Sequence, residues 1–452
     1  MEKILENLVK NEIKNFNENK YKNNFYDDTD LGKINVKVFG IGGAGCNVIE
    51  CMAKSYNWNN AVSLYALDTD VRTLRRICES GLNANCHLLG KDICRGNGTG
   101  GDVELAKQVA SNDIEQFKKF IHGSDLIFFI SGLGKGTGSA ITPVFSSIAK
   151  EAGICTVDVI TLPSVQAEGH DVYEKSLASY QEIIDSCNSF YTISNDKLIN
   201  AYIEDEKMTY ENLLNKANMQ VINLIKVISD ILSNPLYTTI AASDILAFFR
   251  KTKIFALLST EIRDSEYSFQ KISDKINAIV AKDCSIVPIS NSHSALLNIL
   301  TTPKTSKNLI VNLKSILASY PNNNNISLKY SCLERPNSDV IKIDILLASK
   351  LTKEELLSNY DQLETSNNNS ASHSGFVSQI PMKGESNDFG IFSAPAKKDK
   401  SSVLPTSEGI KVTQFLDTKG LAHSNSNFQT KQQLSDRECT DILESVYLKA
   451  KK

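Results

Sequence analysis

The spacing of hydrophobic residues changes at Ile34 and then follows a regular alternation. Residues 34–39 alternate apolar and polar positions with period two. Further short β-rich runs occupy residues 62–67, 125–130, 155–160 and 190–193. Segments with helical spacing, such as 141–152 and 173–186, lie between them. Strands alternating with helices are typical of a parallel sheet covered on both faces. The pattern therefore predicts an α/β domain over residues 34–210.

A long apolar segment follows this domain. Residues 211–233 have helical spacing with apolar side chains on more than one face, so we expect a helix buried between two bodies of structure. Pro235 ends it, which gives a central helix over residues 211–235. A smaller α/β domain over 236–350 is predicted from a strand at 295–300, a helix at 306–318 and strands at 326–330 and 340–347.

Both ends of the chain are polar. Residues 1–33 alternate Lys, Glu and Asn, which predicts a polar N-terminal extension. A disordered linker is predicted over 351–438, because residues 363–435 are rich in Ser, Asn, Lys, Gly and Gln and have few clustered apolar side chains. Apolar periodicity returns at 439–452, which we interpret either as a partner-binding peptide or as an inert tail.

Composition excludes some classes of function. The net charge of −3 gives no general electrostatic reason to bind nucleic acid. The chain has no apolar run of the length of a signal peptide or a transmembrane helix, so a cytoplasmic location is expected. The ten cysteines and six histidines are scattered, which favours reduced thiols and no metal site.

Candidate chemistry begins with a glycine-rich segment between a predicted strand and a predicted helix. In Gly40-Ile-Gly-Gly-Ala-Gly45 a phosphate can approach the backbone closely, and the helix that follows offers unpaired N–H donors and a favourable dipole. Taken alone, the segment matches a dinucleotide-binding pattern. Asp68 and Asp70 follow the next strand, about where a ribose-binding acid belongs. A purely structural turn is the alternative.

A second glycine-rich segment strengthens the nucleotide hypothesis. Ser131-Gly-Leu-Gly-Lys-Gly-Thr-Gly-Ser139 lies between a buried run and a helix predicted to begin near Ile141. It is not a Walker A loop, because Lys135 is followed by Gly136. Since a dinucleotide fold needs only one such loop, two facing loops predict a longer polyphosphate held from both sides. A third stretch, residues 95–101, is expected to close over the terminal phosphate.

These segments together resemble the FtsZ family, the tubulin-like proteins of bacterial cell division. The resemblance spans residues 34–350 and is carried by Gly40 to Asn47, Asp68-Thr-Asp70, Arg95-Gly-Asn-Gly, Gly134 to Ser139, Glu168-Gly169 and Ser194-Asn-Asp196. It implies an α/β, tubulin/FtsZ-like fold, with a parallel-sheet nucleotide-binding domain, a long central helix and a smaller α/β C-terminal domain.

The resemblance implies GTP as the ligand, with or without Mg²⁺. The residues it places at the nucleotide are Gly42, Gly43, Ala44, Gly45, Cys46, Asn47, Asp68, Gly134, Gly136, Thr137, Gly138, Ser139, Glu168, Asn195 and Asn218. The first loop would wrap the α and β phosphates, and residues 136–138 would bind the β and γ phosphates. Glu168 would accept a hydrogen bond from the ribose. Asn195 and Asn218 would read the guanine edge, because an amide offers both a donor and an acceptor.

The resemblance also implies hydrolysis between subunits, where an Asn-x-Asp-x-x-Asp loop polarises the attacking water. The matching positions here are Thr239, Ala241 and Asp244, so Asp244 remains as the candidate catalytic residue. Losing a carboxylate that positions water should cost a few kcal/mol, on the order of 10²-fold in rate. Asp244 has a second interpretation, as a favourable acid in the first turn of a helix with Ser243 as its N-cap.

Several further positions depart from the family pattern. They are Ala44, Cys46, Lys135 and Ala140 in place of glycines, Val172 in place of an arginine, and Met219 in place of an acid. For Lys135 two effects stay open: added positive charge near the phosphates, or obstruction of their close approach. The substitutions together favour a divergent family member in which binding is better preserved than turnover.

The sequence therefore predicts a GTP-binding, filament-forming cytoskeletal protein of the cytoplasmic division site, with slow or impaired GTP hydrolysis. Its predicted partners are further copies of itself, head to tail, a second FtsZ-family protein, and a membrane anchor that binds the C-terminal peptide. One alternative is a non-catalytic FtsZ paralogue that binds GTP and modulates the filaments of an intact relative. The other is an NAD-dependent oxidoreductase that uses residues 40–45 and Asp68.

Overall fold

The computed structural model describes residues 34–360, except 57, 59–61, 204, 206, 234–239, 288, 291, 322 and 324. These residues all lie within the first of the two units into which the chain divides, Met1–His373, and none lies in the second, Ser374–Lys452. The predicted N-terminal extension, the peptide at 439–452 and Thr239 therefore lie outside the described residues, as does the linker beyond residue 360.

Six parallel strands form the first half of the sheet. They are β1 (Val36–Ile41), β2 (Val62–Asp68), β3 (Asn85–Leu88), β4 (Leu126–Gly132), β5 (Cys155–Leu162) and β6 (Ser189–Ser194). Neighbours follow the order β3-β2-β1-β4-β5-β6, and all of these pairs are parallel. The five predicted β-rich runs and their parallel pairing are thus confirmed. The order reverses between β1 and β4, and such a reversal opens a crevice at the carboxyl ends of the strands.

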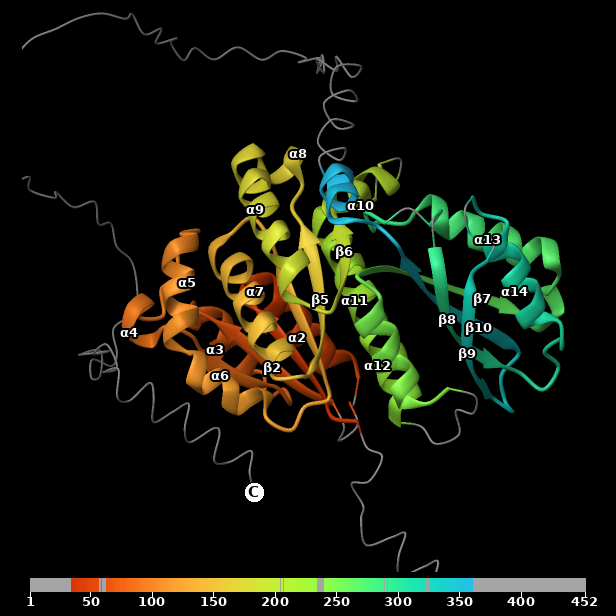
Figure 1. Ribbon diagram of the computed structural model, residues 1–452, viewed down its shortest axis with the longest axis horizontal. Coiled ribbons are helices and arrows are strands. Elements are labelled where there is room, and N and C mark those ends of the chain that lie inside the picture. Colours follow the sequence, from red (N-terminus) through yellow and green to blue (C-terminus); the bar gives the residue numbers. More distant parts are fainter. Residues whose placement is uncertain are drawn as a thin grey trace, which may run out of the picture. The chain divides into compact units, whose positions relative to one another are not determined.

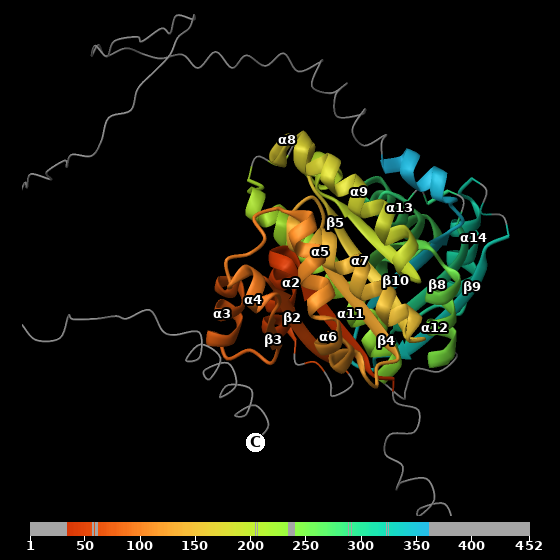
Figure 2. The same cartoon turned by 60° about the vertical axis from the view of Figure 1, so that its left-hand side comes forward.

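Helices cover both faces of this parallel half. They are α2 (Gly42–Ser55), α3 (Val71–Glu79), α4 (Lys91–Cys94), α5 (Val103–Asn112), α6 (Ile114–Ile121), α7 (Gly136–Glu151), α8 (Val165–Glu168), α9 (His170–Ser186) and α10 (Asn195–Ala201). Figure 1 shows the strands between these helices, and Figure 2 shows α3 and α4 beside the β2–β3 edge.

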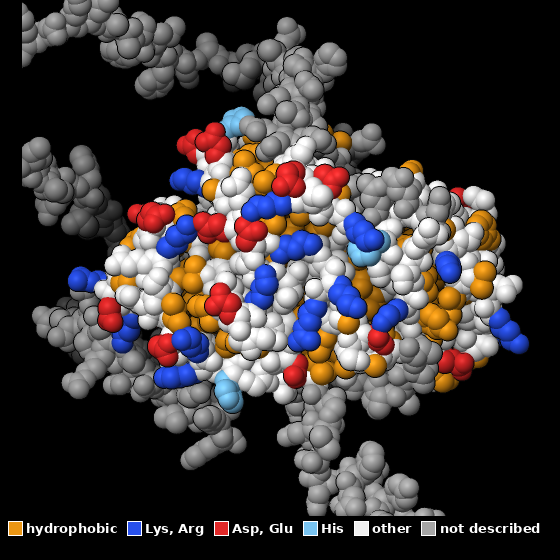
Figure 3. Space-filling model, in the orientation of Figure 1, with side chains coloured by type: hydrophobic (Ala, Val, Ile, Leu, Met, Phe, Trp, Pro, Cys, Tyr) orange, Lys and Arg blue, Asp and Glu red, His pale blue; other side chains and the backbone are white. Residues whose placement is uncertain are grey.

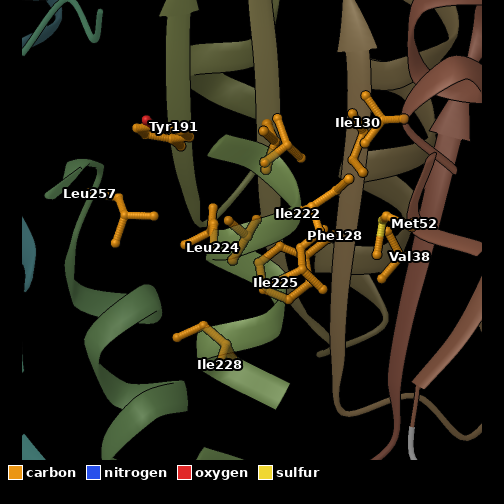
Figure 4. Close-up of a cluster of buried hydrophobic side chains, with 14 of the residues drawn as sticks. Val38, Met52, Phe128, Ile130, Tyr191, Ile222, Leu224, Ile225, Ile228 and Leu257 are labelled. Atoms are coloured by element: carbon orange, nitrogen blue, oxygen red, sulfur yellow. The ribbon is translucent and has the colours of Figure 1, made fainter. Parts of the chain in front are cut away.

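Adjacent residues of each strand bury their side chains in different hydrophobic clusters, because strand side chains alternate between the two faces. Val38 and Phe128 belong to a cluster that includes side chains of α2 and of the central helix (Figure 4). Their neighbours Phe39 and Phe129 belong to a second cluster with α6 and α7. Burial on both faces accounts for the nearly continuous apolar character of these strands.

The predicted central helix is α11 (Tyr210–Ser233). Its middle turns are buried on more than one side, and Ile222, Leu224, Ile225 and Ile228 are inaccessible to solvent. Figure 4 shows these residues between Phe128 on one side and Leu257 of the second half of the sheet on the other. The helix therefore packs against both halves of the sheet, as its apolar pattern predicts.

The second half of the sheet is mixed. Its elements are α12 (Ala242–Lys251), β7 (Ile254–Arg263), the 3₁₀ turn η1 (Asp264–Glu266), α13 (Phe269–Ala281), β8 (Ser292–Thr301), α14 (Leu309–Ala318), β9 (Ser327–Glu334) and β10 (Val340–Ser349). β10 pairs antiparallel with β7 and β8, whereas β9 lies parallel to β8 after the α14 crossover. One parallel pair, Phe190 with Ile254, joins both halves into a ten-stranded sheet. β7 and α13 were not predicted, because an unbroken apolar run such as that of β7 does not distinguish a strand from a helix.

The predicted linker begins too early. Residues 353–360 form a helix, the blue segment of Figure 1, with Leu356 and Tyr360 fully buried. The ring of Tyr360 lies 4.9 Å from that of Tyr173 and 5.0 Å from that of Tyr180, and the Tyr173 hydroxyl donates to the Tyr360 carbonyl over 2.7 Å. These two apolar residues, four positions apart in a polar segment, dock the chain onto α9.

Lysines collect at the C-terminal end of α9. Lys150 donates to the carbonyl of Asp185 over 3.0 Å, and Lys253 donates to that of Cys187 over 2.9 Å. Lys353 pairs with the Asp185 carboxylate at 2.6 Å, which fixes the start of the 353–360 helix. Cations are favourable at this end of a helix because its last carbonyls lack partners and carry partial negative charge. Figure 3 shows basic side chains across the middle of the face on which α7 and α9 lie in Figure 1.

One buried carboxyl generates a prediction about stability. Burial raises the pKa of Asp158 on β5 to about 8, although Ser146 donates a hydrogen bond to it over 2.8 Å. The side chain of an aspartic acid in an unfolded chain has a pKa of about 4. Between about pH 4 and about pH 8 the folded chain therefore binds one more proton than the unfolded chain. The free energy of unfolding should then fall as pH rises, by up to about 1.4 kcal/mol per pH unit from this group.

Asp158→Asn removes this proton. We expect the variant to gain stability relative to the wild type as pH rises from about 5 to about 8, as measured by denaturant unfolding at several pH values. Asp92→Asn, which alters an exposed carboxylate in the first turn of α4, serves as the control. Parallel pH profiles for wild type and Asp158→Asn would contradict the interpretation.

Candidate functional site

A cavity of about 530 Å³ opens at the carboxyl ends of β1 and β4, where the strand order reverses. Its walls come from the β1–α2, β2–α3 and β4–α7 junctions, from residues 98–101, from α8 and α10, and from the first turns of α11. Most of the predicted nucleotide residues line it: Gly42, Gly43, Ala44, Asn47, Asp68, Gly136, Thr137, Gly138, Glu168, Asn195 and Asn218. Gly45, Cys46, Gly134 and Ser139 are not among its lining residues.

The first glycine-rich segment is the start of a helix rather than a loop. α2 begins at Gly42, directly after the extended residue Ile41, and Gly42 has a φ of +72°. The first N–H groups of a helix have no partner within it and carry its positive dipole end. Gly42 and Gly43 line the cavity, and Gly43 has open space where a side chain would begin, so no side chain at this position covers the helix start.

Gly45 and Cys46 lie behind the cavity wall. A Cβ on Gly45 would lie 2.2 Å from the carbonyl oxygen of Ile130, and one on Gly40 would lie 2.3 Å from that of Gly45. The Cys46 thiol is fully buried, 3.6 Å from the carbonyl oxygens of Gly40 and Leu67. These residues therefore set how closely α2 approaches β1 and β4. The side chain of Cys46 packs behind the cavity wall, and a ligand contact of its backbone stays a prediction.

The second glycine-rich segment is also a strand-to-helix junction. α7 begins at Gly136 and not near Ile141, so residues 136–139 form its first turn. A Cβ on Gly42 would lie 3.0 Å from the amide nitrogen of Gly138, which shows that the first turns of α2 and α7 adjoin. Two helix N-termini therefore meet at one cavity, and such an end favours an anionic group.

Gly134 and Ser139 support this junction from behind. The Ser139 hydroxyl accepts a hydrogen bond from the Gly134 amide over 2.8 Å. Gly134 has a φ of +94°, and a Cβ there would lie 2.5 Å from Val172 of α9. Both residues therefore hold the backbone of the turn in place and are not exposed to the cavity.

The third glycine-rich stretch forms the adjacent wall. Gly98 donates its amide to the Thr69 carbonyl over 3.0 Å, and Asn97 forms a bridge with Asp70. Thr99 lies so close to Gly136 that a Cβ on the glycine would be 2.1 Å from its hydroxyl oxygen. A hydrogen bond of 2.7 Å between the hydroxyls of Thr69 and Thr137 ties the β2–α3 and β4–α7 junctions together. The contact of residues 95–101 with a terminal phosphate stays a prediction.

The two aspartates after β2 already have backbone partners. Asp68 accepts the amides of Thr69 and Asp70 on one carboxylate oxygen, at 2.7 and 3.3 Å, and burial raises its pKa. Asp70 caps α3 by accepting the Arg72 amide over 2.9 Å, and it also pairs with the Arg72 guanidinium. Both acids therefore shape the turn, which weakens their interpretation as a ribose-binding pair.

The opposite end of the cavity carries amides and apolar side chains. Asn195, at the start of α10, donates to Glu168 over 3.4 Å, and its buried amide oxygen has no hydrogen-bond partner. Asn218 extends from α11 alongside Tyr210 and Leu214. A buried polar atom without a partner is costly, and this one lies where a ligand edge can satisfy it.

Sequence reasoning missed Thr69, Ser131, Tyr210 and Leu214, which also line the cavity. The sequence could have predicted Tyr210 and Leu214, because positions 210, 214 and 218 share one face of a helix and Asn218 is a candidate residue. The position of Thr69 depends on contacts between the β2–α3 and β4–α7 junctions, which no local pattern encodes.

The candidate catalytic residue lies away from this cavity. Asp244 follows the C-terminal end of α11, whereas the cavity contacts its N-terminal turns up to Asn218. From Asn218 to Ser233 the helix rises about 22 Å at 1.5 Å per residue. α12 instead contacts the amino end of β5, where Cys155 lies near the Leu246 carbonyl. One chain alone therefore does not bring Asp244 to its own cavity.

The local contacts of Asp244 correct the predicted cap. The N-cap of α12 is Ala241 and not Ser243, and the Asp244 carboxylate accepts the Ala241 amide over 3.1 Å. Asp244 also forms an ion pair with Lys329 of β9, and this contact lowers the pKa of its carboxyl. The capping interpretation therefore has direct structural support, and catalysis would have to use a carboxylate that is already paired.

Within the described ranges, no helix combines the length and the apolar character needed to cross a membrane. In the same part of the chain, no group of three or more His, Cys, Asp or Glu side chains is placed to hold a metal ion.

The glycines of α2 provide a matched test of this geometry. Gly45→Ala forces a methyl group against the Ile130 carbonyl, and we expect it to destabilise the protein by about 3 kcal/mol or more. Gly43→Ala places its methyl in open space in a helical turn, so stability should stay equal or rise by up to about 1 kcal/mol. Thermal unfolding of both variants tests the prediction, and an equal loss in both would contradict it.

Comparisons with known proteins agree with this geometry. The model of the Tubulin/FtsZ family GTPase domain matches residues 35–202. The cell division protein FtsZ of Aquifex aeolicus is 30% identical over 210 residues, which cover 46% of this chain and 55% of that protein. FtsZ of Coxiella burnetii is 29% identical over 276 residues, which cover 60% of this chain and 67% of that protein. The chain thus spans about half the length of the first relative and two thirds of the second.

Solved structures share the fold. An FtsZ dimer from M. jannaschii superposes with a TM-score of 0.60 at 22% identity, covering 74% of this chain and 92% of that one. CetZ2 from Haloferax volcanii, solved as a GTPγS-bound protofilament, gives a TM-score of 0.60 at 17% identity, covering 75% of this chain and all of the other. With its glycine-rich junctions, its strand order and these matches, the domain of residues 35–202 belongs to the Tubulin/FtsZ family of GTPase domains.

Proposed function

We propose that this protein binds GTP in the cavity and assembles head to tail with copies of itself into filaments of the cell-division machinery, hydrolysing GTP slowly. The observation that carries the proposal is the meeting of two helix N-termini, those of α2 and α7, at one end of a cavity whose other end carries amides. The relatives named as cell division proteins and the protofilament structure of CetZ2 support it.

The cavity divides into parts that match the parts of GTP. The first turns of α2 and α7 would bind the phosphates through backbone N–H groups, without requiring side-chain charge. Asn195 and Asn218 would pair with the guanine edge, and the unpartnered amide oxygen of Asn195 would accept from it. Glu168 lies between the two ends, where a ribose hydroxyl would donate to it. The accompanying Mg²⁺ stays a prediction, because a metal bound mainly by phosphates needs few protein ligands.

Hydrolysis would require a second copy of the chain. Asp244 lies beyond the far end of α11, so only a neighbouring subunit could bring this residue to the cavity. A heterologous contact of that kind does not close and therefore builds filaments. At the joint, Ala241 contributes a methyl group where the resemblance implies a carboxylate, and Asp244 is paired with Lys329. Both features favour slow turnover.

The same two features favour a second candidate function. A chain that binds GTP but provides no working carboxylate could act as a non-catalytic paralogue that modulates filaments of an intact relative. Division-site location, and anchoring through the peptide at 439–452, belong to both proposals. The oxidoreductase alternative is weaker, because it leaves the β4–α7 junction without a role and because Asp68 and Asp70 already have backbone partners.

Assembly is tested by sedimentation of the purified full chain. We expect filaments to pellet with GTP and to remain in the supernatant without nucleotide, because nucleotide at each joint completes the contact between subunits. Electron microscopy of the pellet would distinguish filaments from aggregates. GTP binding without filaments, unless another family member is added, would favour the paralogue. Binding of NAD without binding of GTP would contradict both proposals.

Ala241→Asp tests the catalytic deficit. The restored carboxylate should polarise the attacking water at the joint and raise the rate of phosphate release at least ~10-fold, equivalent to about 1.4 kcal/mol in the barrier. Ala241→Asn provides a control of similar size without the charge. An equal rate for both variants would show that the missing carboxylate does not limit hydrolysis.

A further inference from the structure

The side chains of the cavity carry more negative than positive charge. Its charged lining side chains are the carboxylates of Asp68, Asp70 and Glu168 and a single cation, Lys135. The helix N-termini provide partial positive charge, but a triphosphate carries several full negative charges. Lys135 is therefore the one cavity-lining side chain among the described residues that can neutralise a full phosphate charge.

Lys135 extends between the two ends of the cavity. Its backbone is the extended N-cap of α7, directly before Gly136, where the phosphates are proposed to bind. Its ammonium nitrogen lies 3.4 Å from a carboxylate oxygen of Glu168, on α8 toward the ribose and base end. The Lys135 side chain remains 76% exposed, whereas that of Glu168 is 21% exposed. The lysine thus lies at the solvent side of the cavity and is free to turn.

The contacts that hold this ion pair are long. Glu168 also accepts the side-chain amide of Asn195 and the backbone amide of Ser164, both over 3.4 Å. Hydrogen bonds of this length lie beyond the usual range and are weak. A solvent-exposed ion pair contributes only about 0–1 kcal/mol. A phosphate that carries more charge than a carboxylate can therefore displace Glu168 as the partner of Lys135.

We infer that Lys135 exchanges partners when nucleotide binds, leaving Glu168 for the terminal phosphate of a nucleoside triphosphate, and so favours triphosphate over diphosphate. This inference rests on the proposed GTP-binding function. The exchange also releases one carboxylate oxygen of Glu168, which can then accept from the ribose. Lys135 is thereby a specificity-determining residue of the phosphate subsite, and the open choice between added charge and obstruction resolves in favour of charge.

Isothermal titration calorimetry of the full chain with GTPγS, GDP and GMP tests the inference. Lys135→Met keeps the length of the side chain and removes its charge. We expect about 10-fold weaker binding of GTPγS, a smaller loss for GDP and no change for GMP, whereas Lys135→Arg should retain most of the preference for triphosphate. Lys118→Met is the matched control, because it removes an exposed lysine from an ion pair on α6 that does not line the cavity.

The outcomes separate the inference from the function on which it rests. If the wild type binds neither GTPγS nor GDP, the proposed function fails and the inference fails with it. If the wild type binds GTPγS and Lys135→Met binds it equally well, the inference alone is overturned. Tighter binding by Lys135→Met would show that the lysine obstructs the cavity. Thermal unfolding of each variant establishes that a loss of binding is not a loss of fold.

Discussion

The close approach of both α2 and α7 to strand β4 is the constraint on which the cavity depends. Backbone meets backbone at this point, since a single methyl group on Gly45 would lie 2.2 Å from the Ile130 carbonyl and one on Gly138 would lie 2.7 Å from that of Gly132. Only residues without a Cβ allow both helices to begin at the same switch point of the sheet. The glycines that face away from the cavity therefore shape it as much as those that face it.

The central helix separates the cavity from Asp244 in space. The N-terminal turns of α11 line one end of the cavity, and its C-terminal end leads to α12 and Asp244. Because a helix is rigid and its rise per residue is fixed, the two ends stay far apart within one chain. Any use of Asp244 on a nucleotide must then be a property of the assembly. α11 is buried against both halves of the sheet, so it joins the cavity to the segment that carries Asp244.

Backbone and side chains contribute charge of opposite sign to the cavity. Helix ends provide a fixed positive potential whose strength does not depend on side-chain ionisation. Most charged side chains of the cavity are carboxylates, which reduce this positive potential. Two of them, Asp68 and Asp70, accept backbone amides in the turn after β2. Lys135 is the exception, and its weak pairing with Glu168 leaves its charge available to a ligand.

The sequence by itself determined the local elements: the parallel strands, the central helix and the glycine-rich junctions that end in helices. These follow from periodicity and from residue types that act over a few neighbours. Tertiary structure alone decided that Cys46 and Ser139 lie behind the cavity, that Tyr360 docks on α9 and that Lys329 pairs with Asp244. Each of these depends on contacts between residues far apart in the chain, and the local spacing of one partner does not identify the other.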